Sequence, residues 1–132
     1  MPTIPLDLDG YTDLPPGLIA NVVTYLAIES RDSGPFAPLP EGFAITRQSG
    51  TDLAAYRALY RRIGEKWLWF SRAVMDDATL RAELTRPGST VLFLERHGEP
   101  VGLVELQNSA DGGEVEVEMF GVVEEVAGTG AA

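Results

Sequence analysis

Hydrophobic and polar residues alternate along the last third of the chain in a pattern typical of β-strands. Three such runs follow one another, at 90–96, 101–107 and 114–120. Turn-forming residues separate them, as expected for antiparallel hairpins. The third run alternates strictly, so its acidic residues are predicted to share one face and its apolar residues the other. These two sets are Glu114, Glu116 and Glu118, and Val115, Val117 and Met119. We therefore predict a three-stranded meander.

A helical period replaces this alternation in the middle of the chain. Apolar residues recur three or four positions apart over 53–63. Thr51 or Asp52 can cap the first turn of this helix, and Gly64 is a natural stop after the last. The pattern predicts one amphipathic helix between these signals.

A second, shorter helix is predicted after Asp76 or Asp77, either of which can act as its cap, and it ends before Pro87. The intervening residues 65–75 are rich in aromatic side chains and fit either a helix or an ordered loop. Arg72 in this stretch is expected to be solvated.

Residues 1–42 are predicted to form a separate N-terminal region. Residues 1–17 are rich in proline and aspartate and suggest an extended arm. Residues 18–28 are dense in β-branched and aromatic residues and predict a strand, and the prolines of 33–42 indicate a linker. The remaining residues, 43–132, open with another alternating stretch and are expected to be the folded domain.

The amino-acid composition of the chain argues against several classes of function. The chain has 132 residues, of which 45% are hydrophobic, enough for one apolar core. With no cysteine and one histidine, neither disulfides nor a metal site is expected. The net charge of -10 argues against nucleic acid as a partner and suits a cationic or amine substrate. No apolar stretch is long enough to cross a membrane and the opening residues do not resemble a signal peptide, so a cytoplasmic location is expected.

The last strand leads into a loop that contains two closely spaced glycines. This loop has the sequence Gly128, Thr129, Gly130 and Ala131. Glycine lacks a Cβ atom and tolerates positive φ, so the amides of such a loop can approach an oxyanion. The pattern predicts a phosphate-binding loop, although a flexible tail has the same composition.

The order of one strand, two helices, three antiparallel strands and a Gly-x-Gly loop resembles the first half of the GNAT superfamily of N-acetyltransferases, over about 43–132. The resemblance implies an α/β (α+β) fold with a mixed, mostly antiparallel sheet. It also implies transfer of an acetyl group from acetyl-CoA to an amine, on a small molecule or a protein. The loop at 128–131 would wrap the pyrophosphate of acetyl-CoA. The end of the last strand would pair with the pantetheine arm of acetyl-CoA. This strand end comprises Phe120, Gly121, Val122 and Val123.

The chain departs from this family in two respects. Glu125 stands where the loop of the family usually has arginine or glutamine, so its carboxylate must point away from a pyrophosphate. The later helices and strands of the family, including a tyrosine that protonates the leaving thiolate, have no counterpart here. The resemblance therefore implies a truncated portion of an acyltransferase, with its C-terminal half missing.

Acyl transfer to an amine needs a base that removes the ammonium proton. Glu118 and Glu105 lie on neighbouring predicted strands close to the proposed thioester site, and are the candidates; a solvated polar face is the simpler interpretation. The family lines its acceptor pocket with residues between the two helices. Here these are Trp67, Trp69 and Phe70, which are also suited to core packing.

Two other functions remain open from the sequence. A non-catalytic module could form a homodimer or bind a partner through the exposed edge of its last strand. A β-rich ligand-binding protein would instead close residues 1–28 and the meander into a barrel.

Overall fold

The computed structural model describes residues 4–5, 7–20, 23–30 and 34–132. The chain divides into two compact units, 1–35 and 36–132. Within the described residues, every helix and strand belongs to the second unit. None of the helices found there combines the length and hydropathy needed to cross a lipid bilayer.

The second unit contains a four-stranded sheet in which all neighbours are antiparallel. Its strands are β1 (Phe43–Gln48), β2 (Ser89–Arg96), β3 (Glu99–Asn108) and β4 (Val115–Val122). The spatial order β1-β2-β3-β4 follows the sequence, so the predicted meander and the strand before it are confirmed. Because β1 and β4 lie at opposite edges of the described sheet, it does not close into a barrel.

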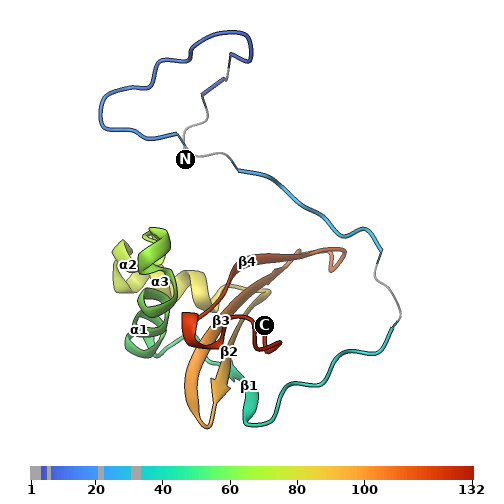
Figure 1. Cartoon of the computed structure of the whole chain (residues 1–132). Coiled ribbons are helices and arrows are strands. Elements are labelled where there is room, and N and C mark those ends of the chain that lie inside the picture. Colours follow the sequence, from blue (N-terminus) through green and yellow to red (C-terminus); the bar gives the residue numbers. More distant parts are fainter. Residues whose placement is uncertain (1–3, 6, 21–22, 31–33) are drawn as a thin grey trace. The chain divides into compact units, whose positions relative to one another are not determined.

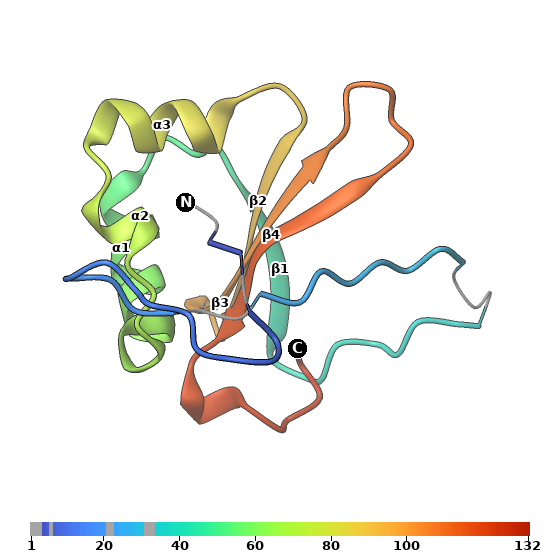
Figure 2. The same ribbon diagram turned by 90° about the horizontal axis from the view of Figure 1, so that it is seen from above.

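Three α-helices connect β1 to β2, which makes this a mixed α/β unit of the α+β type. They are α1 (Leu53–Gly64), α2 (Ser71–Val74) and α3 (Asp77–Thr85). The unit also contains two 3₁₀ turns, η1 (Glu65–Trp67) and η2 (Glu124–Val126). Figures 1 and 2 show α1, α2 and α3 gathered on one face of the sheet. The aromatic stretch 65–75 is thus neither one helix nor one loop.

The two predicted helix starts are confirmed by their caps. Asp52 accepts a hydrogen bond from the amide of Ala55 at 3.0 Å, and Asp76 accepts one from the amide of Thr79 at 2.9 Å. Each bond satisfies an amide that the first turn of a helix leaves without a partner. The apolar stripe of α1 then packs on the sheet. The core contains Tyr56, Leu59, Tyr60, Ile63, Leu80, Leu84, Val91, Phe93 and Leu103.

A β-bulge in β4 overturns part of the predicted alternation. Glu105 of β3 pairs with Met119, while Leu106 pairs with Val117, so Glu118 is an extra residue on β4. Residues paired across strands share a face, so Met119 lies on the helix side with Glu105 and not beside Val117. The prediction for Met119 is wrong because strict alternation assumes an uninterrupted ladder.

The strand predicted at 18–28 is also wrong for the residues that are described there. Residues 18–20 and 23–28 belong to no strand, and the side chains of Ile19, Tyr25 and Leu26 are exposed. Strand propensity reflects how well a side chain fits a half-buried pleated surface, and among the described residues no strand pairs with this segment to supply one. Asn21, Val22 and parts of the predicted arm and linker lie outside the described residues.

Candidate functional site

The sequence-predicted site residues fall into two groups at different places in the second unit. The end of β4 and the glycine loop lie at one end of the sheet, beside η2. The two carboxylates, Glu105 and Glu118, lie beneath the helices.

The end of β4 is well ordered by its neighbours. The amide of buried Val123 donates to the carbonyl of Val101 at 2.8 Å, so the ladder with β3 continues one residue beyond β4. A Cβ added to Gly121 would lie 2.6 Å from Cγ2 of Ile63 and 2.9 Å from Cη2 of Trp69. Glycine is therefore required here for α1 to pack closely on the strand. Phe120 and Val122 face the other side, and Phe120 is exposed.

The glycine loop is exposed but anchored at both ends. Val126 and Ala131 are buried in the core cluster, whereas the residues between them are exposed. Gly128 and Gly130 have φ of +76° and +79°, which glycine adopts without strain. The amide and hydroxyl of Thr129 both donate to the carbonyl of Val126, at 3.3 and 2.8 Å. These contacts hold the loop in a defined conformation.

Three of the four backbone amides in 128–131 have no hydrogen-bond acceptor among the described residues, and one of them is that of Ala131. Within the described residues, the amides of Gly128 and Gly130 have no hydrogen-bond acceptor. A Cβ at either position would meet nothing within 4 Å, so the space around both glycines is open. Fixed amides of this kind are suited to an anion.

The acidic residues beside the loop are paired with cations. Oε1 of Glu125 lies 3.8 Å from Nη2 of Arg62, and Glu124 forms an ion pair with Lys66. The hydrogen bond from Lys66 lowers the pKa of Glu124, and the same bond raises the pKa of Lys66. The carboxylate of Glu125 is thus directed toward α1, as the phosphate-loop hypothesis requires.

A hollow of about 370 Å³ lies next to η2. Its volume falls in the range of about 300–1,000 Å³ that small-molecule sites occupy. Basic, acidic and apolar side chains line it: Arg62, Arg96, His97, Glu99, Val101, Val123, Glu125 and Val126. Arg62 also pairs with Glu99, while Arg96 has no acidic partner among the described residues and stacks over the ring of Phe43 at 5.6 Å. Two arginines and two glutamates line the hollow, so these four side chains add no net charge to it.

Glu105 lies in a buried polar cluster and is only 2% exposed. The hydroxyl of Tyr56 donates to its Oε1, and Arg72 donates to its Oε2 from Nε and Nη2, at 3.3 and 3.0 Å. Burial, together with the charge of Glu105, raises the pKa of Tyr56. Burial alone would lower the pKa of Arg72, but the hydrogen bond and charge of Glu105 outweigh it and raise that pKa. The hydroxyl of Tyr56 and the guanidinium of Arg72 are therefore both held in their protonated forms.

Glu118 extends the cluster toward solvent. Its Oε2 lies 3.5 Å from Nη2 of Arg72, and its Oε1 accepts from Arg86. The bulge in β4 places its carboxylate between these two arginines. We call the set Tyr56, Glu105, Arg72, Glu118 and Arg86 the polar cluster. Sequence reasoning missed the arginines, because Arg72 is 33 residues from Glu105 and no local pattern links them.

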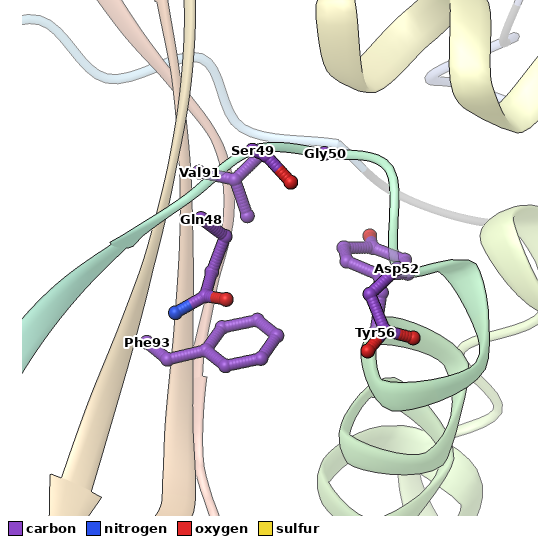
Figure 3. Close-up of a pocket in the computed structure, with 7 residues that line it drawn as sticks. All are labelled: Gln48, Ser49, Gly50, Asp52, Tyr56, Val91 and Phe93. Atoms are coloured by element: carbon purple, nitrogen blue, oxygen red, sulfur yellow. The ribbon is translucent and has the colours of Figure 1, made fainter.

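A cavity of about 10 Å³ lies on the other side of Tyr56, between the β1–α1 connection and β2. Figure 3 shows Phe93 and Gln48 facing Tyr56 across it. A space of this size holds about one water molecule, so it does not accommodate a substrate.

The three candidate acceptor residues do not share one environment. The ring of Trp69 packs 5.4 Å from that of Tyr60 and lies against Gly64 and Gly121, so it belongs to the core. Trp67 and Phe70 are exposed beside it. Leu68 between them is also exposed, with a φ of +58° that is rare for a non-glycine residue. Trp67 and Phe70 are thus more accessible to an acceptor than Trp69, which is partly buried.

Comparison with known proteins adds no family to these observations. No family model matches the chain, and no curated protein matches it. In the part of the chain that the structure describes, no group of three or more histidine, cysteine or acidic residues is arranged to hold a metal ion. The case for a function rests on the residues and their geometry.

Proposed function

We propose that this chain belongs to a GNAT-like N-acyltransferase that moves an acetyl group from acetyl-CoA to an amine. In this proposal the unit 36–132 supplies the strand and the loop that bind acetyl-CoA. The observation that carries it is the anchored glycine loop after β4 and η2, in which the amides of Gly128, Gly130 and Ala131 have no acceptor among the described residues.

The residues around this loop fit a diphosphate. The amides of Gly128 and Gly130 would donate to its oxygens, and the guanidinium of Arg62, 3.8 Å from Glu125, would offset part of the negative charge of that residue. The outer edge of β4 near Phe120 would donate and accept hydrogen bonds along the pantetheine arm. Acetyl-CoA itself would supply the activated acyl group.

The remaining candidates take different parts in this proposal. Glu118 is the carboxylate that a water molecule could connect to an acceptor amine, because its side chain is 20% exposed. The side chain of Glu105 is only 3% exposed, so we assign it to positioning Arg72, which in turn holds Glu118. Trp67 and Phe70 would contact the acceptor.

Calorimetric titration of the full chain with acetyl-CoA tests the proposal. Gly130→Val should weaken binding by about tenfold, or ~1.4 kcal/mol, because a branched side chain does not tolerate the loop conformation. Gly112→Val is the matched control, since Gly112 also has positive φ and open space but lies in the β3–β4 connection. It should leave the affinity unchanged.

Two results would contradict the proposal. One is the absence of binding at millimolar acetyl-CoA by wild-type protein that is shown to be folded by circular dichroism. The other is binding that Gly130→Val and Gly112→Val reduce equally, since this would place the ligand away from the loop.

A further inference from the structure

Trp69 follows a tight turn that ends η1 after α1. The amide of Leu68 donates to the carbonyl of Glu65 at 3.2 Å, and the amide of Trp69 donates to the carbonyl of Gly64 at 3.0 Å. With Leu68 in the left-handed conformation, these two hydrogen bonds form the Schellman arrangement that ends many helices. In this motif the residue after the left-handed one commonly packs against the last turns of the helix. The turn therefore directs Trp69 back toward α1.

The left-handed conformation of Leu68 is not explained by its own side chain. Glycine is the usual residue at this position, because it has no Cβ to make positive φ unfavourable. The side chain of Leu68 is 77% exposed, so it buries little apolar surface that would offset the cost. A residue is held in such a conformation only when the surrounding structure fixes it. We therefore look to the contacts of Trp69 for what holds this turn.

The indole of Trp69 fills the space between α1 and the end of β4. A Cβ at Gly64 would overlap this indole, and a Cβ at Gly121 would lie 2.9 Å from its Cη2. The ring also packs 5.4 Å from the ring of Tyr60 on α1. Both glycines thus make room for the indole, which sets the spacing between α1 and Gly121.

The end of β4 depends on this contact because its ladder is interrupted upstream. The bulge at Glu118 bends the strand. Beyond the bulge, Gly121 pairs with Leu103, and the amide of Val123 donates to the carbonyl of Val101. These contacts with β3 fix the strand end within the plane of the sheet. Trp69 contacts it from the helix side and so fixes its position perpendicular to that plane.

We propose that Trp69 is a positioning residue for the pantetheine arm of acetyl-CoA. It holds the backbone of Gly121 at a fixed distance from α1, so the amides and carbonyls of 120–122 keep the directions in which they pair with the arm. The inference rests on the proposed function, and it gives Trp69 a different part from the acceptor contact predicted from the sequence. The diphosphate is held by the loop at 128–131, so its binding does not require Trp69.

Binding of acetyl-CoA and of ADP separates the two parts of the site, because ADP carries a diphosphate and no pantetheine arm. In the full chain, Trp69→Phe should weaken acetyl-CoA binding by about tenfold, since a smaller ring leaves the strand end less well preorganised, and should leave ADP binding unchanged. Trp67→Phe is the matched control, because it makes the same change at a side chain that is 76% exposed. It should alter neither affinity. Equal weakening of both ligands by Trp69→Phe, or of acetyl-CoA by both variants, would overturn the inference, as would an unchanged affinity of Trp69→Phe for acetyl-CoA.

Fluorescence of the Trp67→Phe variant tests the inference with Trp69 intact. The chain has two tryptophans, so tryptophan emission of this variant comes from Trp69 alone. Acetyl-CoA should shift this emission and ADP should not, because only the pantetheine arm pairs with the strand that the indole contacts. An emission that stays constant while acetyl-CoA binds would overturn the inference. Failure of the proposed function has a different signature, since the wild-type chain would then not bind acetyl-CoA at all.

Discussion

The two faces of the four-stranded sheet differ in how much apolar surface they bury. On the face covered by helices, Phe93 and Leu103 are almost completely buried. On the other face, Ile45, Val117 and Phe120 remain more than half exposed. Burial of apolar surface is the main favourable term in folding, so the helix side provides most of the stability. Leu94 on this face is buried in the core cluster, so the exposed part of the face is the part around Ile45, Val117 and Phe120.

The comparison holds for charged residues as well. Glu105 is buried on the helix side with two hydrogen-bonding partners, whereas Glu116 two strand positions away is exposed. A buried charge is tolerated only when it is paired, while an exposed one is stabilised by water. Glu105 therefore has a structural role and Glu116 a surface role, although both are glutamates on adjacent strands.

Apolar truncation on the two faces gives the largest predicted contrast. Leu103→Ala should lower the free energy of unfolding by about 3–4 kcal/mol, because it leaves a cavity in the packed core. Val117→Ala on the open face should change it by no more than about 0.5 kcal/mol. Urea denaturation followed by circular dichroism measures both. Similar losses for the two variants would show that the open face is covered in solution.

Breaking the polar cluster should have the next largest effect. Arg72→Met removes the cation that faces Glu105 and should cost about 3 kcal/mol, since an unpaired buried carboxylate remains. The double variant Arg72→Met with Glu105→Leu should be more stable than Arg72→Met alone, because no buried charge is left. The same urea experiment checks this. A double variant that is less stable than the single one would show that the pair contributes more than it costs to desolvate.

The smallest effect is expected at the cap of α3, and it depends on pH. The hydrogen bond from Thr79 lowers the pKa of Asp76 in the folded protein. Its contribution is therefore present above the unfolded pKa of about 3.9 and is lost as pH falls through the lower folded value. Asp76→Ala should be less stable than wild type at pH 7, with a difference that shrinks in acid. Asp13→Ala, in the first unit, is the control. Thermal unfolding at several pH values tests this, and a difference that stays constant down to pH 2 would contradict it.

Local signals predicted most of the second unit because they act within one turn or one hairpin. The Asp52 and Asp76 caps each depend on an amide three positions away. The alternation of 90–96 and 101–107 likewise predicted β2 and β3. The same reasoning predicted a strand at 18–28, and that prediction is wrong because strand propensity without a pairing partner does not make a strand.

The sequence by itself determined the order of the four strands and two longer helices of the second unit, the glycine loop after β4 and the absence of cysteine chemistry. Only the tertiary structure decided that Met119 turns to the helix side, that Trp69 packs over Gly121, and that Arg72 joins Glu105 to Glu118. These depend on a bulge, on the closeness of α1 to β4, and on contacts between residues more than 30 positions apart. Periodicity and capping are properties of neighbouring residues, whereas the partner of a buried side chain is set by register and packing across the whole unit.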